Sequence, residues 1–221
     1  MAIPITSIRA VILDLDGTLV DSAEEIALAL NETLAGLGLP VVSLEDATAL
    51  IGRGVRSLVE RAVEQVGATA DLDHAVEIFE AHYERRVATR ATLFPEVMEG
   101  LVAMRAAGLK LGVVTNKPRL FTEKLLAHLG IDRLFDAVVA GDDGLRRKPF
   151  GDMLAEAARQ MGASIEDTLM LGDSDNDVLA ARDAGCLVWC VPYGYNEGRP
   201  AESLACDRMV ATVLEAARLL E

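Results

Sequence analysis

The stretch Asp14-Leu15-Asp16-Gly17-Thr18-Leu19 decides the fold of this chain. It directly follows the apolar run at residues 10–13, which is typical of a strand buried on both faces. Side chains two residues apart on an extended chain point the same way, so Asp14 and Asp16 should lie side by side where this strand ends. Gly17 then permits a sharp turn. Taken alone, the two residues could also be a turn cap and a solvated carboxylate. A cation or a reaction is the better reason to keep both carboxylates there.

The remaining pattern predicts an α/β fold. Apolar runs at residues 109–115, 137–140, 168–172 and 187–191 read as strands, and helical repeats closed by glycines separate them. Alternation of this kind indicates a Rossmann-like, doubly wound, mostly parallel sheet with helices on both faces. Residues 21–88 show only helical periodicity. We therefore expect an α/β core formed by residues 1–20 and 89–221, with a helical cap domain, residues 21–88, inserted after the first strand.

Composition and charge exclude several classes of function. The chain has 221 residues, of which 51% are hydrophobic, and its formal net charge is −14 at pH 7. So acidic a surface repels phosphate backbones, so we expect no nucleic-acid partner. No apolar run has the length of a membrane span, and residues 1–9 do not resemble a signal peptide, so we expect a cytoplasmic protein without a membrane partner. We expect it to be a monomer or a homodimer.

Polar residues follow the predicted strands at one edge of the sheet. In a parallel α/β sheet, ligands bind beyond the carboxyl ends of the strands. Asp14, Thr115 and Asp173 each lie within a residue or two of such an end, and Lys148 lies in the loop after the strand at 137–140. The sequence therefore predicts that these side chains meet in one crevice.

Four motifs in this order resemble the haloacid dehalogenase-like superfamily of phosphohydrolases. They are the Asp14–Leu19 stretch, the Thr115-Asn116 pair, the Lys148-Pro149 pair and Gly172-Asp173-Ser174-Asp175-Asn176-Asp177. Each motif alone is weakly specific, but the four together span nearly the whole chain. The position of the helical insert is similar to that of the helical cap in one subclass, where the cap closes over a small substrate and excludes water.

The resemblance implies a role for each carboxylate. Asp14 would be the nucleophile that forms an acyl-phosphate, which water later cleaves. Asp16 would protonate the leaving alcohol and then deprotonate the attacking water. Asp14, Asp173 and the backbone carbonyl of Asp16 would hold Mg²⁺, which prefers hard oxygen ligands. The metal would also offset the repulsion between these carboxylates and a phosphate dianion.

The resemblance also implies roles for the polar residues around them. Lys148 would lie against Asp14 and the transferring oxygens, and Thr115 with the Asn116 backbone would donate hydrogen bonds to the phosphoryl group. Asp177 would order the metal site or pair with Lys148. Simpler alternatives stay open: Lys148 as a surface residue, and Thr115-Asn116 and Asp177 as helix caps.

Position 16 separates the branches of the superfamily. Dehalogenases of this fold lack the second aspartate, and cation-pumping ATPases have threonine there, so Asp16 favours phosphate release or transfer between sugars. Phosphonate-cleaving relatives use a lysine of the insert, and residues 21–94 contain none. A phosphate-binding module without activity is a further alternative, but the presence of all the catalytic groups argues against it.

Two further stretches concern the substrate. Residues 51–62 (IGRGVRSLVERA) and 193–198 (YGYNEG) resemble the bacterial phosphoglycolate phosphatase family, which implies hydrolysis of 2-phosphoglycolate to glycolate and phosphate. The chain departs from that family in having Asp175 where arginine is frequent and Phe150-Gly151 where His-Pro is frequent. A sugar phosphate or an amino-sugar acid phosphate as substrate, or a sugar phosphomutase activity, therefore stays an alternative.

The turn at residues 51–56 is a candidate for reading the rest of the substrate, a small phosphorylated metabolite. Gly52 and Gly54 flank Arg53, so this turn can approach a ligand closely. An arginine fork suits a carboxylate, which predicts that Arg53 and Arg56 bind the glycolate carboxylate when the cap closes. The alternative is that both arginines are solvated residues at the start of a helix.

Overall fold

The central sheet of the protein is entirely parallel. The computed structural model describes residues 8–221. Six strands lie in the order β5-β4-β1-β6-β7-β8, and each pairs with its neighbour in parallel. Their bounds are β1 (Ala10–Leu13), β4 (Lys110–Val114), β5 (Ala137–Val139), β6 (Thr168–Gly172), β7 (Leu187–Cys190) and β8 (Arg208–Met209). The predicted fold class is confirmed.

Strand β1 lies in the middle of this sheet and all four of its residues are buried. Its last residue, Leu13, is level with Val113 of β4 on one side and with Leu171 of β6 on the other. The three strands therefore end at the same edge. The residues that follow them emerge next to one another, although they are far apart in the sequence.

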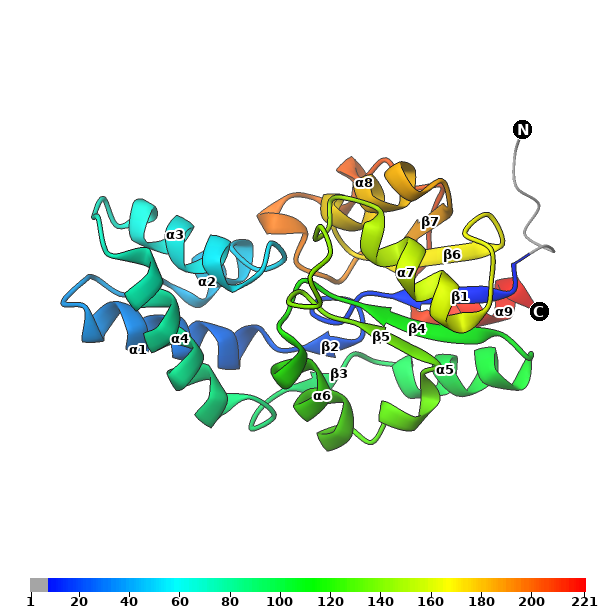
Figure 1. The fold of residues 1–221 in the computed structure, drawn as a ribbon, viewed down its shortest axis with the longest axis horizontal. Helices are drawn as coiled ribbons and strands as arrows, with labels where there is room; N and C mark the ends of the chain where they lie inside the picture. Colours follow the sequence, from blue (N-terminus) through cyan, green and yellow to red (C-terminus); the bar gives the residue numbers. More distant parts are fainter. Residues whose placement is uncertain (1–7) are drawn as a thin grey trace.

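Alternate residues of β1 face opposite helical layers. Val11 and Leu13 belong to one apolar cluster, whereas Ala10 and Ile12 belong to the other. The first layer contains α5 (Val97–Ala106), α6 (Arg119–His128) and α9 (Val213–Leu220), and the second contains α7 (Asp152–Met161) and α8 (Asp175–Ala184). Figure 1 shows the two layers on either side of the sheet. Within residues 8–221 the core region also contains the short 3₁₀ helices η2 (Asp132–Leu134), η3 (Asn196–Gly198) and η4 (Ala201–Ser203).

Four helices lie beyond the end of the sheet, at the left of Figure 1. They are α1 (Ala23–Gly36), α2 (Leu44–Ala49), α3 (Val55–Gln65) and α4 (Leu72–Arg86). Helix α1 packs against α2 and α4, and α3 packs against α4. Their buried side chains, such as Leu30 and Phe79, continue the apolar cluster of one face of the sheet. The division into a core and a cap at residues 20/21 and 88/89 stays a prediction.

The two segments that join this insert to the core form a small sheet of their own. Strand β2 (Val20–Asp21) pairs antiparallel with β3 (Thr92–Leu93). The sequence did not predict this pair, because two-residue strands are too short to show a period. Pairing holds the entrance and the exit of the insert side by side.

Within residues 8–221, none of the helices combines the length and the apolar character that crossing a membrane requires.

Candidate active site

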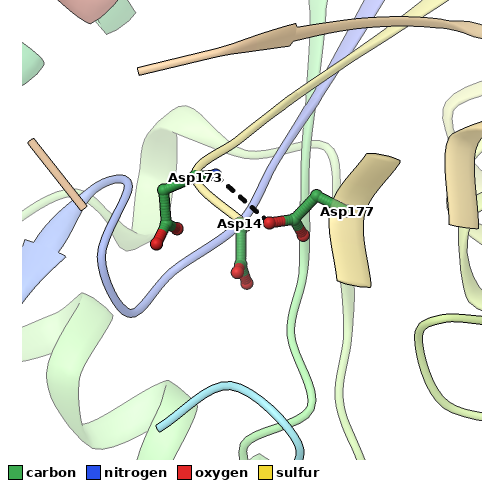
Figure 2. A group of neighbouring side chains, drawn as sticks. All are labelled: Asp14, Asp173 and Asp177. Carbon is green, nitrogen blue, oxygen red and sulfur yellow. Dashed lines mark hydrogen bonds between the residues drawn. The ribbon is translucent and has the colours of Figure 1, made fainter. Parts of the chain in front are cut away.

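Three buried carboxylates meet at the carboxyl edge of the sheet. Asp14 follows β1, Asp173 follows β6, and Asp177 lies in the first turn of α8. One oxygen from each lies within 4.8 Å of the others, and Figure 2 shows Asp14 between the two other side chains. The convergence of distant residues in one crevice follows from the parallel order of the strands.

Lys148 is the cation of this cluster. Its Nζ lies 2.7 Å from Asp14 Oδ1 and 2.7 Å from Asp177 Oδ1, and its side chain is only 1% exposed. Asp14 Oδ1 also accepts a hydrogen bond of 2.7 Å from the backbone N–H of Leu15. This holds one oxygen of Asp14 firmly and leaves Oδ2 for a ligand or a reaction.

Asp177 contacts both Lys148 and the backbone at the start of α8. It pairs with Lys148, and its Oδ2 accepts hydrogen bonds from the backbone N–H groups of Asp173 (3.2 Å) and Ser174 (3.1 Å). The Ser174 hydroxyl donates to the same oxygen at 2.8 Å. Ser174 and Asp177 also form a capping box at the start of α8, in which each side chain accepts from the other's backbone N–H. The helix cap thus fixes the carboxylate that faces Lys148.

The cluster has more negative charge than its lysine can offset. Burial raises the pKa of Asp14 well above its ordinary value of 3.8, and Asp177 and Asp173 add to the rise. Burial and repulsion by Asp177 raise the pKa of Asp173 to about 7. Burial alone would lower the pKa of Lys148, but its pairing with Asp14 and Asp177 raises it above the ordinary 10.5. The electrostatics of the cluster therefore suit a bound divalent cation.

The backbone around Asp173 is shaped to hold its side chain in place. Thr18 Oγ1 donates to Asp173 Oδ1 at 2.8 Å, and the Tyr195 N–H donates to Oδ2 at 2.8 Å. Gly17, with φ of +88°, and Gly194 approach the carboxylate so closely that an added Cβ would lie 2.4 Å and 2.2 Å from its atoms. Oxygen ligands held in this way fit Mg²⁺.

Asp16 lines a cavity beside the carboxylate cluster and has partners of its own. Its Oδ1 accepts a hydrogen bond of 2.5 Å from Ser22 Oγ, and its Oδ2 lies 3.0 Å from Lys117 Nζ. Asp14 and Asp16 both line this cavity. The two carboxylates of the first motif therefore have different surroundings and are suited to different tasks.

Thr115 and Asn116 are buried at the end of β4, on the wall of the same cavity. The Asn116 side chain donates to the carbonyl oxygens of Gly52 and Lys148, both at 2.9 Å, and its own oxygen has no partner among the described residues. Thr115 Oγ1 accepts a hydrogen bond of 3.2 Å from the Lys117 N–H. Asn116 thus joins the turn of the insert to the loop that carries Lys148.

The remaining walls of the cavity come mainly from the insert and from α6. They are apolar and include Ile26, Ile51, Val55, Leu58, Phe79 and Phe121. Lys117 and Tyr83 also line the cavity, and the sequence predicted neither as a site residue. Lys117 directly follows Asn116 after β4, a position that could have signalled it. No local signal distinguishes Tyr83 from an ordinary core residue of an amphipathic helix.

The structure places Arg53 and Arg56 outside this cavity. Arg53 forms a two-pronged ion pair with Glu197, in which Nη2 lies 2.8 Å from Oε2, and its side chain is 52% exposed. Arg56 pairs with Asp73 on the surface of the insert and is 54% exposed. Neither arginine is among the residues that line the cavity, because each already has a carboxylate partner elsewhere. In this arrangement neither arginine lines the cavity, and their role in binding substrate stays a prediction.

Asp175 does not add an uncompensated charge to the site. Its Oδ2 lies 2.5 Å from Arg199 Nη1, and Arg199 follows η3. Position 175 is an aspartate in this chain instead of the arginine frequent in the resembling family. An arginine from another loop, Arg199, lies beside it and offsets its charge.

Comparison with known proteins identifies the family. A sequence model of the haloacid dehalogenase-like hydrolases matches residues 8–185. The chain belongs to this family. The phosphoglycolate phosphatase of Nitrosospira multiformis is 41% identical, with 97% of this chain and 96% of that protein covered. The one from Thiobacillus denitrificans is 40% identical, with 96% of each chain covered.

A solved structure shows the same fold over the full length. The crystal structure of a predicted phosphoglycolate phosphatase from Haemophilus somnus 129PT superposes with a TM-score of 0.90 and 30% sequence identity. The match covers 99% of this chain and 100% of that one. The predicted membership of the haloacid dehalogenase-like family, and with it the predicted hydrolase, is confirmed.

Proposed function

We propose that the protein is a Mg²⁺-dependent phosphatase that hydrolyses 2-phosphoglycolate to glycolate and phosphate through an aspartyl-phosphate on Asp14. The observation that carries this proposal is the buried cluster of Asp14, Asp173 and Asp177 around Lys148, beside a cavity that Asp16 lines. The names of the relatives above support the choice of substrate. Sugar phosphates, an amino-sugar acid phosphate and a sugar phosphomutase activity are the alternatives.

Asp14, Asp173 and the backbone carbonyl of Asp16 would hold the metal ion. Thr18 and the Tyr195 N–H keep the Asp173 carboxylate in position for this purpose. A bound Mg²⁺ would neutralise the surplus negative charge and offset the repulsion between the carboxylates and the phosphate. Lys148 adds a fixed positive charge beside Asp14 and Asp177.

In the proposed reaction, an oxygen of Asp14 attacks the phosphorus atom. Its Oδ2 is suited to this, since Oδ1 is held by Lys148 and by the Leu15 N–H. The bond between phosphorus and the ester oxygen breaks, and Asp16 gives its proton to the leaving oxygen. Asp16 then takes a proton from the water that attacks the acyl-phosphate, which releases phosphate and restores Asp14. The Thr115 hydroxyl and the Asn116 N–H would donate hydrogen bonds to the phosphoryl oxygens.

Helices α1–α4 would act as a cap, with residues 21–88 as the cap domain and residues 1–20 and 89–221 as the core. Three links between them support this assignment: the hydrogen bond from Asn116 to Gly52 O, the ion pair of Arg53 with Glu197, and the β2–β3 pair at the base. The β2–β3 pair would serve as the hinge. Closure over the cavity would exclude water from the acyl-phosphate until the alcohol has left.

The partner of Arg53 leads to a prediction about this cap. Because Arg53 pairs with Glu197 of the core, we expect Arg53→Ala to weaken closure and to lower kcat/KM by about 3- to 10-fold for every substrate alike. Glu197→Gln should give at least as large a loss, since Glu197 also lies 3.9 Å from Arg61 and 3.7 Å from Arg199. Steady-state kinetics measure this with two substrates, 2-phosphoglycolate and an aryl phosphate whose alcohol part carries no charge. A loss confined to 2-phosphoglycolate would instead support the sequence-based prediction that Arg53 binds the carboxylate.

Asp16→Asn tests the proposed acid and base. The amide can neither give nor take the proton, but the backbone carbonyl is retained, so kcat should fall by about 10²- to 10⁴-fold. Asp132→Asn, an exposed aspartate of η2, is the matched control and should behave as wild type. A loss of less than about tenfold in Asp16→Asn would show that another group transfers the proton.

A panel of phosphate esters tests the proposed substrate. We expect kcat/KM for 2-phosphoglycolate to exceed that for hexose phosphates, pentose phosphates and an amino-sugar acid phosphate by at least about tenfold. Phosphate release is the readout, with product analysis for transfer between sugars. A sugar phosphate at the top of the ranking would overturn the proposed substrate while leaving the phosphatase chemistry in place.

A further inference from the structure

The cavity beside Asp16 contains a buried cation that the reaction described above does not use. Lys117 follows Asn116 after β4, and its side chain is 5% exposed. Among the described residues that line the cavity, Asp14 and Asp16 are the anions and Lys117 is the one cation. A lysine is seldom buried unless it is paired, so its place in a cavity with mainly apolar walls needs a physical reason.

Two partners fix the position of the ammonium group. Lys117 Nζ lies 3.0 Å from Asp16 Oδ2 and donates a hydrogen bond of 2.9 Å to Tyr83 Oη. An ammonium has three N–H donors, so these two contacts leave one donor for a further ligand. The lysine is therefore held in place and still has capacity to bind an anion.

Tyr83 connects this lysine to the helical insert. It lies on α4, and its hydroxyl donates to Glu25 Oε1 of α1 at 3.1 Å. Burial, together with Asp16 and Glu25, raises the pKa of Tyr83 well above 10.0, so the phenol stays neutral and can accept from Lys117. The arrangement of Lys117 and Tyr83 is thus made by the core and the insert together, and it is complete only when the insert is seated on the core.

The chemistry of the proposed substrate places an anion next to Asp16. In 2-phosphoglycolate the carboxylate is attached to the carbon that carries the ester oxygen. Asp16 would act on this ester oxygen, so the substrate carboxylate would lie within a few bonds of Asp16. Lys117 is the cation at that place, whereas Arg53 and Arg56 pair with Glu197 and Asp73 outside the cavity.

We propose that Lys117, oriented by Tyr83, binds the carboxylate of the substrate and sets the preference for carboxylated phosphate esters. The inference rests on the proposed phosphatase function. It names the residue that distinguishes 2-phosphoglycolate from phosphate esters without a carboxylate. The residue that binds the substrate carboxylate is then Lys117 of the core, beside the phosphoryl site. The insert contributes Tyr83, whose phenol holds Lys117 in place.

The test compares two esters that differ in the carboxylate alone. Ethyl phosphate has a methyl group where 2-phosphoglycolate has its carboxylate, so any effect of Lys117 on Asp16 acts on both substrates. We expect Lys117→Met to lower kcat/KM for 2-phosphoglycolate about 100-fold more than for ethyl phosphate. Tyr83→Phe should show the same selectivity at about 3- to 10-fold. Lys124→Met, a surface lysine paired with Glu84, is the matched control and should leave both values unchanged.

The outcomes separate this inference from the proposed substrate. Equal losses on both esters in Lys117→Met would overturn the inference and would show that Lys117 serves only Asp16 or folding. If Lys117→Met does not fold, as judged by circular dichroism, Tyr83→Phe decides on the same ratio. A wild-type enzyme that prefers another carboxylated phosphate ester would overturn 2-phosphoglycolate as the substrate. Lys117 would then still be tested on that ester and on its analogue without the carboxylate.

Discussion

Asp14→Asn should abolish turnover of 2-phosphoglycolate, with a fall in kcat of about 10⁴-fold or more. The amide has no carboxylate oxygen to form the acyl-phosphate, and no other carboxylate of the cluster has the same access to the cavity: Asp14 lines it, whereas Asp173 and Asp177 do not. The side chain keeps its shape, so the hydrogen bond from the Leu15 N–H can persist. Phosphate release under saturating substrate and Mg²⁺ is the measurement.

The control for this variant is again Asp132→Asn, which changes the same chemical group at an exposed position. Circular dichroism should show that Asp14→Asn is folded, because the substitution removes a charge from a cluster that has too many of them. Turnover within about a hundredfold of wild type would mean that Asp14 is not the nucleophile.

Removal of the divalent metal should have an effect nearly as large. Chelation with EDTA should lower activity by about 10³-fold or more, because Asp14, Asp173 and Asp177 would then face a phosphate dianion with Lys148 alone to offset the charge. Added Mg²⁺ should restore activity. Full activity in excess EDTA, or restoration by zinc alone, would contradict the proposed metal site.

The metal should also change stability in a way that depends on pH. In the metal-free protein the pKa of Asp173 is raised from 3.8 to about 7, so between these values the folded state binds more protons than the unfolded state. This group therefore makes the metal-free protein less stable as the pH rises through that window. Mg²⁺ binds the ionised carboxylate, so its stabilising effect should grow over the same range.

Thermal unfolding with and without Mg²⁺, at several pH values, measures this linkage. We expect the increase in Tm caused by Mg²⁺ to be small near about pH 5 and clearly larger near about pH 7.5, because the Asp173 carboxyl loses its proton between these values. In Asp173→Asn both the increase and its pH dependence should be lost. An increase in Tm that is the same at all pH values would show that Asp173 does not titrate as the site requires.

The sequence predicted those parts of the site that parallel topology brings together. Asp14, Thr115 and Asp173 follow apolar runs, and the carboxyl ends of neighbouring parallel strands meet at one edge. Their convergence needed no knowledge of side-chain packing. Lys148 was placed from the loop in which it lies, and the structure shows that it contacts both Asp14 and Asp177.

The contacts between the insert and the core could not be predicted in the same way. Arg53 finds its partner, Glu197, 144 positions along the chain, and Lys117 meets Tyr83 34 positions away on another element. Neither the helical repeat of apolar residues nor the end of a strand predicts Glu197 or Tyr83 as a partner. Both contacts depend on how the helices of the insert pack against the core. The sequence therefore predicted which residues gather at the edge of the sheet, but it assigned the substrate carboxylate to arginines that pair with Glu197 and Asp73 in the structure.

The central claim, a phosphoryl group carried covalently by Asp14, has a direct test. Enzyme turning over 2-phosphoglycolate with Mg²⁺ is quenched in acid, digested and analysed by peptide mass. We predict one added phosphoryl group on the peptide that contains Asp14, increased in Asp16→Asn if acyl-phosphate cleavage becomes the slower step, and absent after chelation or in Asp14→Asn. A phosphoryl group on any other residue, or one that persists in Asp14→Asn, would contradict the account.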